Sequence, residues 1–514
     1  MNSERTSSDV DVVVIGSGIG GLCTAALLAR YGKRVVVCES HAIAGGAAHS
    51  FTRRGFCFDS GPSFYCGLQA SHSLNPLRYV LAAIGESLDV VSYDPLGRYH
   101  FPEGTFPVYS DSDRYRQEIA AITPTGAVEL ERFERRMLQM FDALRGIPTL
   151  ALRADWQLLK VLLSRYGTKL LPFLPHAGAV SRPLAELMRG VIRDRWVRRL
   201  IDLECFLLSG LKAEGTIAAE MAFMFGERSN VGVDYPIGGS GAIVEALVRG
   251  LQRYGGELKL KAHVDRMLVR AGRAIGVRLR NGEDIQAATV ISNASIWDTY
   301  GKLIDPADVP AAERSRALQT PAIHSFMHLH LGIRGDGLTE RLQELGGHHV
   351  VVHDSDLDIA EPGNTCMISI PTVWDASLAP DGHHVVHAYT LEPYAGWQRD
   401  ETYIDRKRER SQTLYRALEK VIPDIRDRVE LELIGTPLTH AHYLRRNRGT
   451  YGAEIAAGQG MFPGPQTGIA GFYRVGDSTM PGIGVPAAAA SGILCANTLV
   501  PVRKTSVLLD ELGL

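Results

Sequence analysis

The sequence is poor in cysteine. Its 514 residues include only seven cysteines, which is an odd number, and they are scattered along the chain, mostly among apolar neighbours. Neither a disulfide framework nor a zinc site has this spacing. We therefore expect reduced core thiols and a protein that works in a cytosol-like compartment.

The chain also lacks an excess of charge of either sign. The net charge at pH 7 is −2, and basic residues are interspersed with acids even in the densest cluster, Arg406 to Arg410. Binding to nucleic acid requires a basic patch or stripe on the protein. We therefore expect no nucleic acid among the partners.

Long apolar runs are missing as well. No stretch of about 18 uncharged apolar residues occurs, so the sequence predicts no membrane-spanning helix. The polar leader Met1 to Ser8 does not have the pattern of a signal peptide. The stretch Trp156 to Leu174 is apolar with basic residues at intervals. This pattern fits a helix on a lipid surface and, equally, a helix that covers a core, so peripheral membrane contact stays open.

The most informative stretch that is present runs from Asp9 to Ser40. A β-branched run ends at Gly16-Ser17-Gly18-Ile19-Gly20-Gly21, an Ala- and Leu-rich segment follows, and a second β-branched run leads to Glu39. This order predicts a strand, a turn, a helix and a strand around a dinucleotide. In such a turn the first glycine permits the tight bend, the second lets backbone approach a pyrophosphate, and the third lets the helix pack on the strand.

Glu39 indicates which nucleotide binds. It lies about twenty residues beyond the turn, where a carboxylate accepts hydrogen bonds from both ribose hydroxyls. The same carboxylate would repel a 2′-phosphate. The sequence therefore predicts FAD or NAD and disfavours NADP.

A second signal lies near the end of the chain. A short strand is followed by Gly476-Asp477-Ser478, and Pro481 to Pro486 then leads into the Ala-rich segment Ala487 to Leu499. An Asp after a buried strand can hold a ribityl hydroxyl, and a helix N-terminus favours negative charge at one edge of a flavin. This arrangement favours FAD.

Two other patterns have weaker interpretations. The turn Gly238 to Gly241 is glycine-rich, but no long strand precedes it, so we interpret it as a packing turn. His328 and His330 share one face of an expected strand, a spacing that could bind metal. Because no cluster of acids or cysteines accompanies them, we expect hydrogen-bonding or pocket-lining histidines and no metal.

These motifs together carry a family resemblance. The segments VIGSGIGGL, GGAAHSF and FDSGPS near the start, VISNAS in the middle, and NRGTYG and GDSTMPGIGVPAAAASG near the end resemble the phytoene desaturase and carotenoid isomerase flavoproteins. That family lies within the amine-oxidase-like FAD superfamily, and the carotenoid isomerase-like branch of photosynthetic organisms is the most similar. One departure is Ala47, where amine oxidases and many desaturases carry an arginine, which weakens an amine oxidase reading.

The resemblance implies an α/β fold, in which a split Rossmann-type FAD-binding domain carries an inserted substrate domain of sheet and helices. The implied parts are residues 1–75, 227–300 and 441–514 for FAD, 76–226 as a mainly helical substrate or membrane-facing insertion, and 301–440 as the substrate sheet with its helices. The strand-rich stretch Leu258 to Ala294 would belong to the nucleotide-binding sheet. The implied FAD-binding residues are Gly16, Ser17, Gly18, Gly20, Gly21, Glu39, Ser40, Gly46, Ala47, Val264, Gly476, Asp477, Val485 and Pro486.

The reaction is less sharply defined by the resemblance. It implies an FAD-dependent enzyme acting on an apolar, carotenoid-like polyene, with cis-to-trans isomerisation by reduced flavin as our first hypothesis. Desaturation, retinol saturation, hydration and a carotenoid-binding protein with structural FAD remain alternatives. The expected location is cytoplasmic and peripheral on a photosynthetic membrane. Glu214, His328 and Tyr451 are candidate acids among which the sequence does not choose, and it leaves the oligomeric state open.

Overall fold

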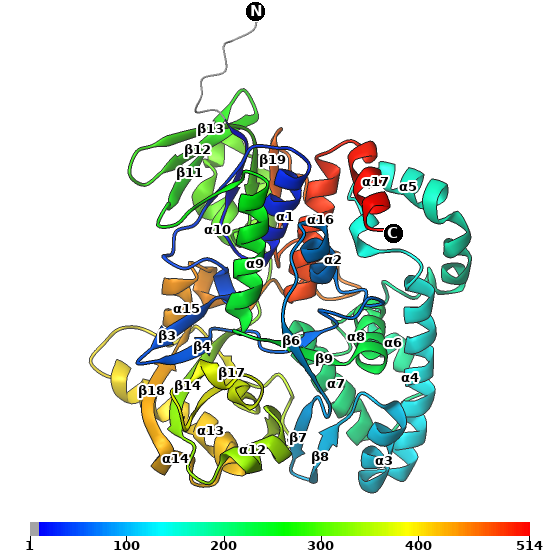
Figure 1. Cartoon of the computed structure of the whole chain (residues 1–514), viewed down its shortest axis with the longest axis vertical. Helices are drawn as coiled ribbons and strands as arrows, with labels where there is room; N and C mark the ends of the chain where they lie inside the picture. Colours follow the sequence, from blue (N-terminus) through cyan, green and yellow to red (C-terminus); the bar gives the residue numbers. More distant parts are fainter. Residues whose placement is uncertain (1–9) are drawn as a thin grey trace, which may run out of the picture.

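The computed structural model describes residues 10–514, so the predicted leader Met1 to Ser8, together with Asp9, lies outside the described residues. Two seven-stranded sheets organise the chain. The first lies at the top of Figure 1, and the second lies at the lower left beneath the hairpin of β3 (Ser50–Arg53) and β4 (Phe56–Asp59). A group of helices occupies the lower right.

The first sheet has the order β10-β2-β1-β13-β12-β11, and β19 also pairs with β13. The strands β10, β2, β1, β13 and β19 run parallel, whereas β11, β12 and β13 form an antiparallel meander. The bounds are β1 (Val10–Ile15), β2 (Val35–Cys38), β10 (Glu257–Lys259), β11 (Val264–Arg270), β12 (Arg273–Leu279), β13 (Asp284–Ser292) and β19 (Phe472–Arg474). Three stretches that are distant in the sequence thus build one sheet.

Strand β1 is buried on both faces. Val12 and Val14 belong to the core on one side of the sheet, and Val13 and Ile15 belong to the core on the other side. This explains why β1 is a continuous β-branched run and does not alternate with polar residues.

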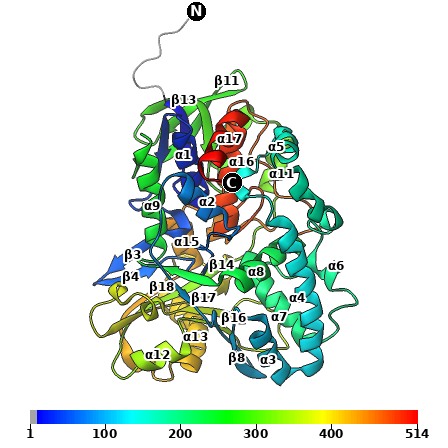
Figure 2. The same cartoon turned by 45° about the vertical axis from the view of Figure 1, so that its right-hand side comes forward.

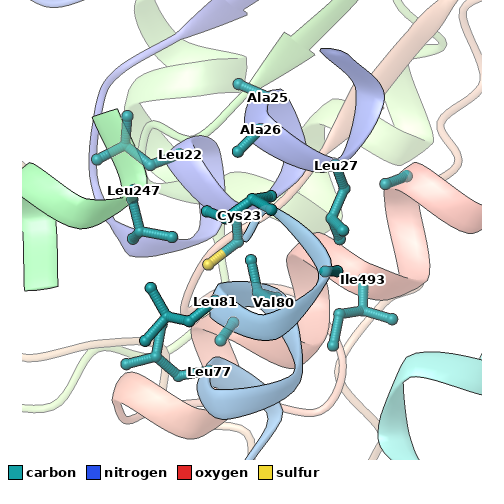
Figure 3. Close-up of a cluster of buried hydrophobic side chains, with 14 of the residues drawn as sticks. Leu22, Cys23, Ala25, Ala26, Leu27, Leu77, Val80, Leu81, Leu247 and Ile493 are labelled. Atoms are coloured by element: carbon teal, nitrogen blue, oxygen red, sulfur yellow. The ribbon is translucent and has the colours of Figure 1, made fainter. Parts of the chain in front are cut away.

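One face of this sheet is covered by α1 (Ile19–Arg30), α2 (Pro76–Ala83), α9 (Ser240–Arg253) and α16 (Val485–Thr498). Figure 3 shows side chains of all four helices gathered around Cys23. Helices α1 and α16 approach closely at Gly492, because a Cβ atom there would lie 2.8 Å from the Cβ of Cys23. The labelled residues are Leu22, Cys23, Ala25, Ala26, Leu27, Leu77, Val80, Leu81, Leu247 and Ile493.

The second sheet has the order β18-β14-β17-β16-β15-β7-β8 and is antiparallel except between β15 and β7. Helix α13 (Tyr403–Val421) packs on one of its faces. Its strands are β7 (Gly97–Phe101), β8 (Gly104–Val108), β14 (Ser325–Arg334), β15 (His348–Val352), β16 (Thr365–Ser369), β17 (His383–Glu392) and β18 (Val429–Gly435). The mainly helical stretch 76–226 therefore also supplies two strands of this sheet.

The helical stretch contains α3 (Ser112–Ile122), α4 (Pro124–Leu144), α5 (Gln157–Tyr166), α6 (Leu184–Met188), α7 (Arg195–Ser209) and α8 (Ala218–Val231). Apolar residues recur at helical spacing over Pro183 to Leu208, and the structure forms two helices there, α6 and α7. The chain breaks at Gly190, where φ is +75°, and α7 starts anew where Asp194 caps the backbone N–H of Val197.

The remaining elements connect these layers. Helices α5 and α17 lie beside each other in both views (Figures 1 and 2), joined by the ion pair of Arg165 and Asp510. The elements are β3 (Ser50–Arg53), β4 (Phe56–Asp59), β5 (Tyr65–Cys66), β6 (Val90–Tyr93), β9 (Val233–Pro236), α10 (Ile296–Asp298), α11 (Ala311–Leu318), α12 (Thr339–Leu345), α14 (Ile425–Arg428), α15 (Pro437–Tyr443) and α17 (Val502–Glu511).

No helix within residues 10–514 is long and apolar enough to cross a membrane.

Candidate active site

A single cavity of about 1,260 Å³ connects the two sheets. Its wall begins at the glycine-rich turn after β1 and includes residues of the second sheet, α7 and α8. Twelve of the fourteen residues predicted to bind FAD line it, and the other two, Ser17 and Gly21, lie behind the wall. The predicted residues therefore meet around one space.

Three glycines of the turn, Gly18, Gly20 and Gly21, have no room for a side chain. A Cβ atom at Gly21 would overlap the carbonyl oxygen of Gly16, and one at Gly20 would lie 2.8 Å from the backbone nitrogen of Gly476. A Cβ atom at Gly18 would lie 2.6 Å from the amide nitrogen of Asn293. Asn293 follows β13 within the VISNAS motif, but we did not predict it as a site residue. Its side chain fills the space between the turn and the Gly476 loop.

Glu39 is buried at the end of β2 and faces the cavity. Its Oε2 accepts hydrogen bonds from the backbone N–H and the hydroxyl of Ser17, at 2.9 and 2.7 Å. Its Oε1 accepts the backbone N–H of His41 at 2.7 Å and the hydroxyl of Ser40 at 3.3 Å. The carboxylate is thus fixed in position on the wall, where a ribose can reach it.

Val264 is held next to this acid by backbone bonds. The N–H of Glu39 donates to Lys259 at 2.9 Å, and the N–H of Ala262 donates to Glu39 at 2.8 Å. Both Val264 and Glu39 therefore lie at the same end of the cavity, as adenosine binding requires.

Asp477 marks the opposite end of the cofactor seat. Its Oδ2 accepts a hydrogen bond from Arg446, whose guanidinium also donates to the carbonyl oxygens of Thr450 and Tyr451. Arg446 lines the cavity as well, and the sequence did not single it out. The pair leaves an anion and a cation side by side where the ribityl chain and flavin edge are expected.

The lining between these ends fits FAD. Helices α1 and α16 both begin on the cavity wall, and neither has a side-chain cap. The N–H groups of their first turns are therefore available to negative groups of a ligand. Gly46 and Ala47 complete the wall, because Gly46 packs so closely on Gly18 that a Cβ atom there would lie 3.1 Å from the Gly18 Cα.

The turn Gly238 to Gly241 packs away from this seat. The carboxylate of Asp59 accepts the N–H of Ser240 at 2.8 Å and the hydroxyl of Tyr235 at 3.0 Å. No residue of the turn is part of the cavity wall, within the portion of the chain that the structure describes. This placement agrees with a packing turn.

Beyond the cofactor seat the cavity forms a chamber between the second sheet, α7 and α8. Its walls are largely apolar and aromatic, with Phe206, Phe223, Met224, Phe326 and Tyr389 among them. Its far end contains a buried ion pair, in which Arg228 donates to Glu204 at 2.7 Å. The chamber can hold a long apolar molecule and shield it from water.

A comparison with protein families identifies the fold of this seat. The model described as "Flavin containing amine oxidoreductase" matches residues 19–500. This chain belongs to that family. Membership confirms FAD as the cofactor, the α/β fold with its Rossmann-type FAD-binding part, and an FAD-dependent oxidoreductase or isomerase.

Curated relatives of this amine oxidoreductase family member include "Prolycopene isomerase 1, chloroplastic" of an Oncidium hybrid cultivar, 33% identical over 98% of this chain and 86% of the relative. "All-trans-retinol 13,14-reductase" of Danio rerio is 27% identical over 93% and 84%. "Phytoene desaturase (neurosporene-forming)" of Rhodobacter capsulatus is 26% identical over 98% and 96%. These relatives confirm the resemblance stated from the motifs.

Solved structures agree on the fold. An oxidoreductase from Methanosarcina mazei has a TM-score of 0.60 with this chain at 19% identity, covering 94% of this chain and 99% of its own. At this identity the likeness shows the shared fold.

The second sheet of this family member carries a cluster of buried histidines. His328, His330 and His387 each bring one ligand atom to within 4.8 Å of the others, and His328 Nδ1 lies 2.6 Å from His387 Nε2. Their rings are stacked within 12° of parallel, so their in-plane lone pairs do not converge on one ion without ring rotation. The absence of a metal stays a prediction.

Burial keeps these histidines neutral. Loss of hydration lowers the pKa of His330 to about 4 and that of His440, whose ring contacts His328, to about 3. The same cause lowers the pKa of His328 and of His387 well below the ordinary value of a histidine. His328 and His440 line the cavity, so the expectation of a pocket-lining histidine at His328 agrees with its position.

The three candidate acids from the sequence separate in space. Glu214 is exposed and is not part of the cavity wall, so it is not a candidate for chemistry. His328 and Tyr451 line the wall, and burial raises the pKa of Tyr451 to about 12. The sequence missed Glu220, which lines the chamber and whose pKa burial raises to about 7. The sequence offered one signal for Glu220, which is an acid among apolar neighbours in the first turn of a helix.

Proposed function

We propose that this chain is an FAD-dependent isomerase that converts cis double bonds of a long, carotenoid-like polyene to trans while the flavin is reduced. The observation that carries the proposal is the continuity of the cofactor seat with the apolar chamber in one cavity. A polyene in the chamber can therefore reach the flavin edge without passing through water. The prolycopene isomerase among the relatives supports this class of substrate.

The roles of the protein residues follow from the geometry. Glu39 and the first turns of α1 and α16 hold and orient FAD, while the aromatic and aliphatic wall positions the polyene and excludes water. When bound, reduced FAD supplies electron density to a conjugated system, which lowers the double-bond order. The protein contributes alignment and a dry environment.

We also propose that the substrate enters from a membrane. Trp156, Leu159, Leu163, Leu171 and Leu174 form an exposed apolar patch, and each is between 61% and 80% exposed. Lys160 and Lys169 lie within the same segment, which suits the headgroup layer of an anionic bilayer. Thr149 and Leu152, just ahead of the patch, line the cavity. The patch and the cavity wall are thus neighbours along the chain, and the protein would be peripheral on a membrane.

A desaturase or a polyene saturase is the second candidate. The phytoene desaturase and retinol reductase among the relatives favour it, because those names describe redox reactions on related molecules. The seat and chamber would serve these reactions equally well. Hydration, and a carotenoid-binding role with structural FAD, stay less favoured.

One experiment separates these functions. The FAD-loaded protein is incubated without oxygen with a poly-cis carotenoid and with the all-trans form, with the flavin oxidised or chemically reduced, and the products are analysed by chromatography and mass spectrometry. A product of unchanged mass and altered retention, formed only with reduced FAD, supports the isomerase. Loss or gain of two hydrogens would identify a desaturase or a saturase, and gain of water a hydratase.

A further inference from the structure

Glu220 differs from the other acids of the cavity wall that are not exposed to solvent, a restriction that leaves out the exposed Asp265. Glu204 pairs with Arg228, Asp477 pairs with Arg446, and Glu39 accepts four hydrogen bonds. Within residues 10–514, no hydrogen bond or ion pair reaches the carboxyl group of Glu220. A carboxyl group without a partner on the wall of an apolar chamber lowers the stability of the folded protein. Its presence there therefore indicates a function.

Glu220 belongs to the half of the chamber that adjoins the flavin seat. It lies in the first turn of α8, and the start of α8 contacts the end of α7, where Thr216 and Ser209 hydrogen-bond at 3.3 Å. The end of α7 approaches the flavin seat, because a Cβ atom at Gly484 would lie 3.5 Å from the carbonyl oxygen of Leu208. Arg228 lies two helical turns further along α8, at the end of the chamber that is far from the flavin seat.

The surroundings of Glu220 raise the pKa of its carboxyl group to about 7, so a large share of these groups holds a proton at neutral pH. Ile217, Phe223 and Met224 line the cavity beside it. Loss of hydration is the cause of its raised pKa, with no charged group contributing. The titratable groups on the neighbouring helices α4, α6 and α7 include Asp202, whose pKa burial raises to about 6, and Cys205, which burial keeps as the thiol. They also include the glutamates that pair with Arg228, and Glu186 on α6 near Arg182.

We propose that Glu220 is the catalytic acid and base of the polyene isomerisation. Its carboxyl O–H donates the proton to one carbon of a cis double bond. The π electron pair of that bond forms the new C–H bond, and the positive charge spreads along the polyene. Rotation about the resulting single bond follows, the Glu220 carboxylate takes a proton back from the same carbon, and the double bond forms again as trans. No electrons are gained or lost overall.

The chamber suits this step in two respects. The ring faces of Phe223, Phe326 and Tyr389 on the wall attract a delocalised cation. The apolar wall also excludes water, which would otherwise add to that cation. This inference rests on the proposed isomerase function and assigns one residue to it.

The test compares Glu220→Gln and Glu220→Asp with the wild type, and Glu214→Gln is the matched control because Glu214 is exposed and only six positions away. All four proteins are loaded with FAD and reduced, and single-turnover isomerisation of a poly-cis carotenoid is followed in H₂O and in D₂O from pH 5 to pH 9. Melting temperature, flavin absorbance and polyene binding show that each variant is folded and loaded.

The expected wild-type rate falls about tenfold per pH unit above about pH 7, and its trans product carries deuterium when formed in D₂O. Glu220→Gln is expected to lose roughly a hundredfold in rate together with the deuterium and the pH dependence. Glu220→Asp retains the pH dependence at a lower rate, and Glu214→Gln behaves as wild type.

Isomer formed by the wild type without deuterium, or formed by Glu220→Gln at a rate within twofold of wild type, would overturn the assignment of Glu220 and leave the isomerase standing. A wild-type product changed by two hydrogens, with no isomer of unchanged mass, would instead overturn both.

Discussion

Ser17 binds Glu39 twice, through its backbone N–H at 2.9 Å and its hydroxyl at 2.7 Å, and both bonds end on Oε2. The acid that is expected to bind the adenosine ribose therefore also ties the glycine-rich turn to the end of β2. Specificity for an unphosphorylated ribose and the shape of the pyrophosphate seat depend on the same side chain.

Replacing Glu39 with Ala should weaken FAD binding at least tenfold. A hydrogen bond to a charged group contributes about 1.5–3 kcal/mol, and about 1.4 kcal/mol corresponds to a factor of ten in affinity. The dissociation constant is measured by titrating the flavin-free protein with FAD and following flavin fluorescence. Glu257→Ala, at an exposed position on the neighbouring strand β10, is the control. Equal affinity of Glu39→Ala and wild type would exclude a role for this acid in binding.

Gly21→Ala should destabilise the protein by about 1–3 kcal/mol or more and prevent normal flavin loading. Its Cβ atom would overlap the carbonyl oxygen of Gly16 and would lie 3.2 Å from the side chain of Asn293, which leaves little room to move. Thermal unfolding and the ratio of flavin to protein absorbance measure the two effects. Gly167→Ala is the matched control, because Gly167 has helical dihedral angles and nothing within 4 Å of the added atom. A Gly21→Ala protein as stable as this control would contradict the packing described for the turn.

Charged substitutions in the exposed apolar patch should reduce membrane binding. Trp156→Glu combined with Leu163→Glu removes two of its five apolar side chains and adds repulsion from anionic lipid. We expect at least a tenfold drop in the fraction that sediments with vesicles of phosphatidylglycerol and phosphatidylcholine, with FAD content unchanged. Leu357→Glu alters an exposed apolar residue elsewhere and serves as the control. Equal sedimentation of all three proteins would mean that the patch does not contact lipid.

Glu220 should also make stability depend on pH. Its folded-state pKa of about 7 lies above the ordinary 4.5, so between these values the folded state holds a proton that the unfolded state has released. The free energy of unfolding therefore falls as pH rises from about 4.5 to about 7, by at most about 3 kcal/mol, and this contribution is constant above that range. Glu220→Gln should lack this pH-dependent contribution to the free energy of unfolding. Melting temperatures of both proteins at pH 5 and pH 8 test this, and parallel changes in the two would contradict a raised pKa at Glu220.

The cofactor seat was largely predictable because its requirements are local. Gly16, Gly18 and Gly21 occur in a fixed spacing, since one turn must bend tightly, approach a phosphate and pack on a strand. The residues that complete this seat were not predictable. Asn293 and Arg446 reach it only because β13 and the segment before Tyr451 end beside the turn. Asn293 lies within the VISNAS motif, but neither residue type by itself indicates a contact with the cofactor seat.

The chemistry of the chamber was harder to foresee for a related reason. Glu214 and Glu220 lie six positions apart and have similar neighbours in sequence, yet Glu214 is exposed and Glu220 faces the cavity. Which of them meets substrate depends on how α8 packs against α7. Likewise, His387 joins His328 and His330 only because β17 pairs with β14.

The sequence by itself determined the nucleotide-binding unit, its preference for an unphosphorylated ribose, the second glycine-rich signal near Gly476 and the family resemblance, because each rests on backbone geometry encoded within a few consecutive residues. The tertiary structure alone decided that the seat and the apolar chamber form one cavity, that Asn293 and Arg446 close the seat, and that the carboxyl group of Glu220 faces the chamber without a partner among the described residues. Those properties depend on contacts between segments hundreds of residues apart. Side chains become buried, and their pKa values shift, only when such segments exclude water together.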